Sequence, residues 1–339
     1  MTTDILTTEQ GLILAIEQLQ AEISGKPVAL PPLESTGERD VWLRERETYI
    51  GATDLSAILG LNPYSTPLSV YCSKLRIVEP EPETHAMKRG IILEPAIARF
   101  YENQTGRTVR KWERVVRHPD KPHLGVNPDY YVPDVPTSCD QDELRLVECK
   151  SHLPFVAHHY GEVGTDQVPE WEQVQAQWQC HLTGITRCDV AVLLGLGEDD
   201  FRIYPVTYDP EIGAMLEEAA DAFWTNHIVA QVPPAVTGST ADTSLLKKLY
   251  PKGGEPPKVA DEEINIVAIT LREIKEQMKS LEEDEKRAEN ILRSYMGDAE
   301  ELILASGAQY TLRPVAECYV EGFTRKAFRA LRFKKGKSS

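Results

Sequence analysis

Two carboxylates and one amine are spaced as a metal-assisted hydrolytic site would require. Asp129 follows a proline, and after eighteen intervening residues the chain reads Glu148-Cys149-Lys150. Carboxylate oxygens are the ligands that Mg²⁺ and Mn²⁺ prefer, and a neighbouring lysine could lie near an attacking water or a leaving group. A Glu-x-Lys triplet alone is also common as a simple ion pair on a strand, so the surrounding elements must decide between these interpretations.

The segment 144–150 is predicted to be a strand that is buried on both faces. Side chains alternate between the two faces of a strand, so Glu148 and Lys150 share one face with Leu146, while Val147 fills the other. A carboxylate and an ammonium at the end of a buried strand are costly unless something uses them. Asp129 belongs to a second strand-like segment, 124–132. The two carboxylates could therefore meet at one edge of a sheet, or where two neighbouring strands diverge.

Length and composition favour an ordinary globular protein with one large and one smaller domain. The chain has 339 residues, of which 41% are hydrophobic and 27% charged. It contains no apolar run of about 18 residues and no basic-then-apolar N-terminus, so we expect neither a membrane span nor a secretory signal. The six cysteines show no zinc spacing, which favours reduced thiols and a cytoplasmic location.

The net charge of −16 argues against a nucleic-acid partner, but the charge is unevenly distributed. Residues 87–121 contain nine Lys or Arg against four Asp or Glu, and residues 323–337 contain seven Lys or Arg and no acid. A phosphate backbone needs such local basic patches rather than a basic average.

Periodicity and turn residues predict four regions. These are an N-terminal helix (8–23) and linker within residues 1–36, a main domain of helices and strands at 37–232, a linker at 233–260, and residues 261–339. The last region is predicted to hold a coiled-coil helix, a hairpin and a basic tail. Within the main domain, the order of helices and strands predicts an α/β or α+β fold with a mixed central sheet flanked by helices.

Five motifs of the main domain resemble the YqaJ-type viral recombinases, the family that includes phage lambda exonuclease in the PD-(D/E)xK nuclease superfamily. They occur in the family's order, between about Trp42 and Ile228. The motifs are Trp42 to Arg46 leading into Ile50 to Asp54; Arg89-Gly90 leading into Glu94-Pro95; Gly125 followed by Pro128-Asp129; Glu148-Cys149-Lys150; and a Gln-rich helix ending at Leu182-Thr183-Gly184. The resemblance implies a restriction-endonuclease-like core.

The same resemblance implies a site for two Mg²⁺ or Mn²⁺ ions. Asp129, Glu148 and the backbone carbonyl of Cys149 would hold one ion, and Glu94 would help to hold the second. From the residues alone, Glu94 would be interpreted as a carboxylate in the first turn of a helix, where the helix dipole favours it. Lys150 would orient or deprotonate the attacking water.

The Gln-rich helix and two further groups complete the expected site. Gln177 is the better candidate for contact with the metal-bound water and Gln175 the second, whereas Gln173 and Gln179 are expected in solvent. Arg46 and Thr53 match the residues with which the family binds a terminal 5′-phosphate, and Thr53 is also a typical helix cap. Basic residues expected to face DNA are Lys88, Arg89, Arg107, Arg110 and Lys111.

The function implied is a Mg²⁺-dependent exonuclease that degrades linear double-stranded DNA from the 5′ end, leaving 3′ single strands for phage homologous recombination. Expected partners are DNA ends, two or three further copies in a trimeric or tetrameric ring, and a single-strand annealing protein, in a bacterial host cell with the gene on a phage or prophage. Two alternatives remain open: a structure- or sequence-specific endonuclease of the same fold, and a non-catalytic DNA-binding assembly factor.

Overall fold

The structure, a computed structural model, describes residues 38–79, 84–133, 144–195, 197–251, 256–316, 318–320, 323–325 and 328–334. The described chain falls into two compact units that adjoin in sequence at Pro257 and Lys258. The predicted N-terminal helix at 8–23 lies outside the described residues. Among the helices that are described, none is long and apolar enough to cross a membrane.

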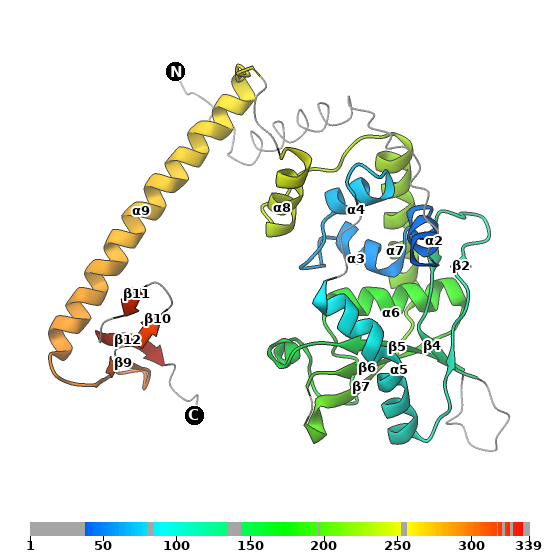
Figure 1. Cartoon of the computed structure of the whole chain (residues 1–339), viewed down its shortest axis with the longest axis horizontal. Coiled ribbons are helices and arrows are strands. Elements are labelled where there is room, and N and C mark those ends of the chain that lie inside the picture. Colours follow the sequence, from blue (N-terminus) through cyan, green and yellow to red (C-terminus); the bar gives the residue numbers. More distant parts are fainter. Residues whose placement is uncertain are drawn as a thin grey trace. The chain divides into compact units, whose positions relative to one another are not determined.

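A five-stranded mixed sheet is the centre of the first unit (Figure 1). The strand order is β1-β4-β5-β6-β7, with β5 and β6 parallel and the other neighbours antiparallel. The strands are β1 (Arg110–Lys111), β4 (Tyr130–Val132), β5 (Arg145–Ser151), β6 (Arg187–Leu193) and β7 (Phe201–Thr207). A separate antiparallel pair joins β2 (Val116–Arg117) to β3 (Gly125–Val126).

Helices pack on both faces of this sheet. The face that carries Leu146 packs on α6 (Glu170–Thr183) through Ala176 and Cys180. The opposite face, with Val147, packs on α5 (His85–Thr105) through residues such as Ile97. The predicted mixed α/β fold with flanking helices is therefore confirmed, and the alternation predicted for β5 places Glu148 on the α6 side.

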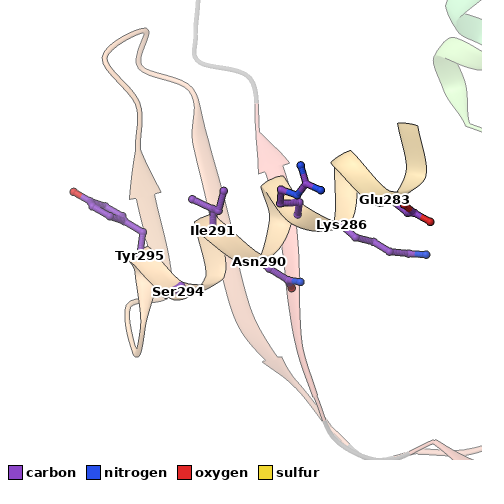
Figure 2. Close-up of a pocket in the computed structure, with 7 residues that line it drawn as sticks. Glu283, Lys286, Asn290, Ile291, Ser294 and Tyr295 are labelled. Carbon is purple, nitrogen blue, oxygen red and sulfur yellow. The ribbon is translucent and has the colours of Figure 1, made fainter. Parts of the chain in front are cut away.

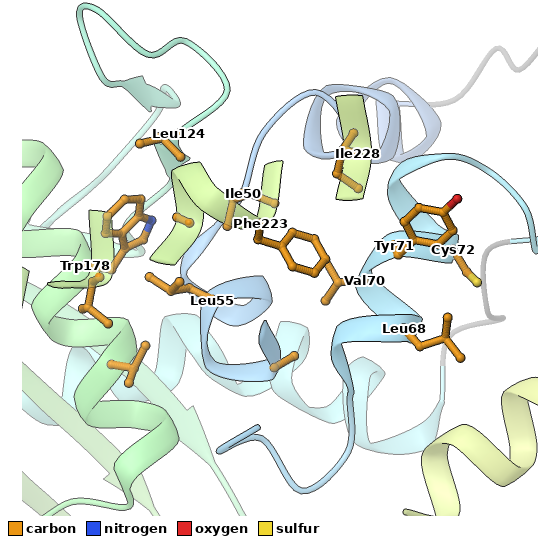
Figure 3. Close-up of a cluster of buried hydrophobic side chains, with 14 of the residues drawn as sticks. Ile50, Leu55, Leu68, Val70, Tyr71, Cys72, Leu124, Trp178, Phe223 and Ile228 are labelled. Atoms are coloured by element: carbon orange, nitrogen blue, oxygen red, sulfur yellow. The ribbon is translucent and has the colours of Figure 1, made fainter. Parts of the chain in front are cut away.

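A further apolar core joins α6 to helices that precede and follow it in the chain (Figure 3). It is built around fully buried side chains that include Ile50, Leu55, Leu68 and Trp178. The other helices are α2 (Glu38–Glu47), α3 (Ala52–Ile58), α4 (Pro67–Lys74) and α7 (Pro210–Phe223), which continues as the π-helical segment Trp224–Val229. Two short 3₁₀ turns lie at Pro154–His159 and Glu198–Asp200.

The interval 233–260, which we predicted to be a linker, contains a packed helix, α8 (Thr240–Leu249). Ser239 caps this helix, and Asp242 in its first turn is fully buried. The Asp242 carboxylate accepts hydrogen bonds from the Thr66 hydroxyl at 2.5 Å and from the Thr237 amide at 2.5 Å. The linker prediction is wrong for these residues because these bonds and the burial of Leu245 fix α8 to the domain.

Helix α5 begins earlier than the apolar stripe at 92–103 indicated. The Thr84 hydroxyl accepts a hydrogen bond from the Met87 amide at 3.2 Å, which starts the helix at His85. Glu94 therefore lies near the middle of α5, where the helix dipole gives it little stabilisation. Gly106 ends the helix in the left-handed conformation, with φ +72°.

The second unit begins with α9 (Glu262–Met296), a single helix of 35 residues. The heptad positions Leu271, Ile274, Met278 and Leu281 are between 47% and 68% exposed. Three antiparallel strands follow in the order β12-β9-β8: β8 (Glu301–Ile303), β9 (Gln309–Val315) and β12 (Phe328–Lys334). A second pair joins β10 (Cys318–Val320) to β11 (Phe323–Arg325). The structure thus contains the predicted long helix and hairpin, and much of the basic tail forms strands.

Candidate active site

Helix α6 and strand β5 meet along a seam of polar side chains, which we call the α6–β5 seam. The Gln179 amide donates to Glu148 Oε2 at 2.5 Å, and Lys150 Nζ donates to Gln175 Oε1 at 2.6 Å. One helical turn earlier, Glu172 Oε1 pairs with His152 Nε2 at 2.8 Å. The three α6 residues recur at intervals of three and four. Their partners Glu148 and Lys150 of β5, and His152 just after it, recur at intervals of two, so each set forms one face.

Lys150 links the two sides of the seam. Its ammonium donates to Glu148 Oε1 at 2.6 Å as well as to Gln175, and its side chain is only 18% exposed. Burial by itself lowers the pKa of Lys150, but the carboxylates of Glu148, Glu172 and Asp129 raise it above its ordinary value. Lys150 is therefore a firmly held cation in this structure.

Asp129 lies directly before β4 and faces the end of β5. Its Oδ2 accepts a hydrogen bond from the Cys149 amide at 2.9 Å. Burial and the negative charges of Glu148 and Glu94 together raise the pKa of Asp129 from 3.8 to about 8. The charges of Glu148 and Glu94 both act on Asp129, so the three carboxylates named from the sequence influence one another electrostatically.

Glu94 reaches this cluster from α5 and forms an ion pair with Lys111 of β1. The Lys111 ammonium also lies 4.8 Å from the centre of the Tyr130 ring. Each carboxylate of the cluster thus has a partner: Lys111 for Glu94, the Cys149 amide for Asp129, and Lys150 with Gln179 for Glu148.

The donor set suits a divalent cation in its chemistry. A buried carboxylate such as Asp129, whose proton affinity two neighbouring carboxylates raise, is stabilised when a cation neutralises it. The side chains are not arranged around such a cation: across the described residues, no three His, Cys, Asp or Glu side chains form a ready metal site. The partners of Glu94 and Glu148, both lysines, hold these carboxylates in the arrangement observed.

The structure corrects our assignment of the glutamines. Gln177, which we predicted to contact the metal-bound water, is buried on another side of α6. There it donates to the Thr207 carbonyl at 2.8 Å and accepts from the Asp209 amide at 2.9 Å. Gln175 makes the contact with Lys150, and Gln179, expected in solvent, is 3% exposed against Glu148. The spacing of Glu172, Gln175 and Gln179 was the signal that could have identified this face.

Arg46 lies beside Asp54, the residue that follows Thr53 in α3. Arg46 Nη2 lies 3.8 Å from Asp54 Oδ1, and the buried Lys74 donates to Asp54 Oδ2 and to the Arg46 carbonyl, both at 2.6 Å. Thr53 is exposed at the second position of α3. The cap of this helix is Gly51, so the alternative reading of Thr53 as an ordinary helix cap is wrong.

The other predicted basic residues differ in their surroundings. Arg89 Nη2 donates to the Ser151 carbonyl at 3.3 Å, which joins α5 to the end of β5, whereas Lys88 is exposed. Arg110 is exposed on β1 beside Lys111. Arg107 follows the glycine that ends α5 and is half-buried. The structure thus brings Lys111 to the carboxylate cluster and Arg89 to the end of β5.

A hollow of about 760 Å³ lies along α9 in the second unit (Figure 2). It is lined by Glu283, Lys286, Arg287, Asn290, Ile291, Ser294 and Tyr295. None of the residues predicted to be catalytic or to bind metal or DNA is among them.

Comparisons with known proteins find two similarities in sequence. Residues 41–186 match the model of the YqaJ-like viral recombinase domain. The chain is 28% identical to the uncharacterized protein YqaJ of Bacillus subtilis (strain 168) over 269 residues, which cover 77% of this chain and 79% of that protein.

Two crystal structures are also similar to this chain. An alkaline exonuclease from Laribacter hongkongensis has a TM-score of 0.44 and 20% identity, over 56% of this chain and 93% of that one. A phage related exonuclease from Haemophilus somnus 129PT has a TM-score of 0.41 and 14% identity, over 54% of this chain and 96% of that one.

Proposed function

We propose that this chain is a divalent-metal-dependent exonuclease acting on linear double-stranded DNA, since residues 41–186 match the model of the YqaJ-like viral recombinase domain. It degrades one strand from the 5′ end and leaves a 3′ single strand for homologous recombination. The observation that carries the proposal is the convergence of Glu94, Asp129 and Glu148 with the Lys150 ammonium at one end of the central sheet.

The carboxylates account for the metal requirement. Asp129, Glu148 and the Cys149 carbonyl would hold one Mg²⁺ or Mn²⁺, and Glu94 would help to hold a second. A bound divalent ion supplies Lewis-acid chemistry, since it makes a bound water more acidic and stabilises charge on a leaving oxygen. The Cys149 amide and the Gln179 amide support this role, because they fix the orientation of Asp129 and Glu148.

Lys150 holds the attacking water or the scissile phosphate in place. In the structure its ammonium has two fixed acceptors, Glu148 and Gln175, and keeps a third N–H for a ligand. The raised pKa of Lys150 favours an orienting and charge-stabilising role. Proton transfer from water to Lys150 needs the amine to be neutral, a form that nearby divalent cations favour.

Arg46 and Thr53 form the contact for a terminal 5′-phosphate. The guanidinium of Arg46 can bind phosphate oxygens with two parallel N–H groups, and the exposed Thr53 hydroxyl adds a further donor. The Asp54 and Lys74 pair supports the position of Arg46. Lys88 and Arg89 extend this contact along the DNA backbone.

A ring of three or four subunits around the duplex would keep an acidic protein on its substrate, and a single-strand annealing protein would receive the 3′ strand. The ring and the annealing protein are both part of this proposal.

The polarity of digestion tests the proposal. A linear duplex with a label at the 3′ end of one strand, or within the opposite strand, is incubated with the protein and Mg²⁺. We expect each strand to shorten only from its 5′ end, so that the 3′ label stays on a long single strand. Release of the 3′ label first would contradict the proposed polarity. Glu148→Gln should leave both strands at full length.

A further inference from the structure

The two lysines at the carboxylate cluster are held very differently. Lys150 is 18% exposed and has two hydrogen-bond acceptors on the α6–β5 seam. Lys111 is 52% exposed, and the contacts of its ammonium are Glu94 and the face of the Tyr130 ring. Lys150 is therefore a permanent part of the site, whereas Lys111 can move into solvent at small cost.

Lys111 is also the residue that a divalent cation bound by Glu94 would meet. It neutralises Glu94, and the charge of Asp129 acts on it as well. An ammonium and a divalent ion cannot both occupy the space beside Glu94, because like charges at a few ångströms repel strongly in a partly buried site.

We propose that the Lys111 ammonium is a resident counter-ion of Glu94 that is displaced when the second divalent ion binds. This inference rests on the proposed metal-dependent function. With Lys111 in place, Glu94, Asp129 and Glu148 can stay close together in the absence of metal. The same contact weakens the binding of the second ion, because that ion must displace Lys111. Lys111 therefore sets the metal concentration at which both ions are bound.

Isothermal titration calorimetry with Mn²⁺ on the full chain tests the proposal. The variants are Lys111→Met, Lys111→Arg and Arg110→Met. Arg110 is the matched control, since it neighbours Lys111 on β1 and side chains alternate along a strand. The second ion is identified as the one that Glu94→Gln no longer binds. Circular dichroism checks that each variant is folded.

Lys111→Met should bind the second ion at least about fivefold more tightly than the wild-type chain, the effect of losing a competing ion pair of about 1 kcal/mol. Lys111→Arg and Arg110→Met should stay within about twofold of it. Unchanged or weaker binding by folded Lys111→Met overturns the inference and leaves the proposed function standing. The inference and the proposed function both fail if the wild-type chain binds no Mn²⁺, or if Asp129→Asn binds as much Mn²⁺ as the wild-type chain.

Discussion

Replacing Gln175 and Gln177 separately with methionine tests which face of α6 serves the reaction. The two residues lie on the same helix and are both buried, at 5% and 1% exposure. Gln175 accepts from the Lys150 ammonium, whereas Gln177 joins the carbonyl of Thr207 to the amide of Asp209. Methionine keeps the length of the side chain and removes the hydrogen bonds, so the comparison isolates the partner that each glutamine serves.

The structure gives different magnitudes for the two changes. A hydrogen bond to a charged group contributes about 1.5–3 kcal/mol, so Gln175→Met should lower kcat roughly 10- to 100-fold if Lys150 is in the mechanism. Gln177→Met removes two hydrogen bonds to partly buried backbone groups and should lower the free energy of unfolding by about 1–3 kcal/mol. Its kcat per folded molecule should stay within about twofold of the wild-type value.

Turnover is measured on linear 5′-phosphorylated duplex DNA with saturating Mg²⁺, and stability by urea unfolding of the same preparations. A tenfold or larger loss of kcat in Gln177→Met, with little effect in Gln175→Met, would refute the reasoning and restore the assignment made from the sequence.

Three further outcomes are expected. Lys150→Ala should remain folded by circular dichroism and lose at least about 100-fold in nuclease rate, and near-normal turnover would remove Lys150 from the mechanism. Arg46→Ala should reduce the ratio of rates on 5′-phosphorylated and 5′-hydroxyl ends, and an unchanged ratio would place the phosphate contact elsewhere. Burial, Glu148 and Glu94 raise the pKa of Asp129 from 3.8 to about 8, so the folded chain keeps a proton that the unfolded chain loses in this range. In EDTA the Tm should therefore fall as the pH rises from about 4 to 8, and Mn²⁺ should raise it most near pH 8; a metal effect that is independent of pH would contradict this link.

The strand that carries the chemistry could be predicted from the sequence because its period is short and unambiguous. Alternation along β5 placed Glu148 and Lys150 on one face with Leu146, as observed. The α6 helix was predicted in its entirety, but its rotation about its own axis was not. Glutamines two residues apart point to opposite sides of a helix, and only packing against β5 decides which side is used.

Tertiary contacts also explain the other differences. The region of α8 is rich in Thr, Ser, Pro and Gly, which favours a linker, yet the buried Asp242 ties it to Thr66, a residue 176 positions earlier. The partner of Glu94 could not be predicted either, because Lys111 is on a two-residue strand that the periodicity did not reveal. Such contacts arise from the fold as a whole and leave no local pattern.

Digestion of linear and closed circular duplex DNA, each with and without Mg²⁺, tests the central claim most directly. We predict that the wild-type chain degrades only the linear form and only with the metal, and that Asp129→Asn degrades neither. Cleavage of the circle would favour an endonuclease of the same fold. Intact linear ends in the presence of both Mg²⁺ and Mn²⁺ would contradict the account and favour a non-catalytic DNA-binding role.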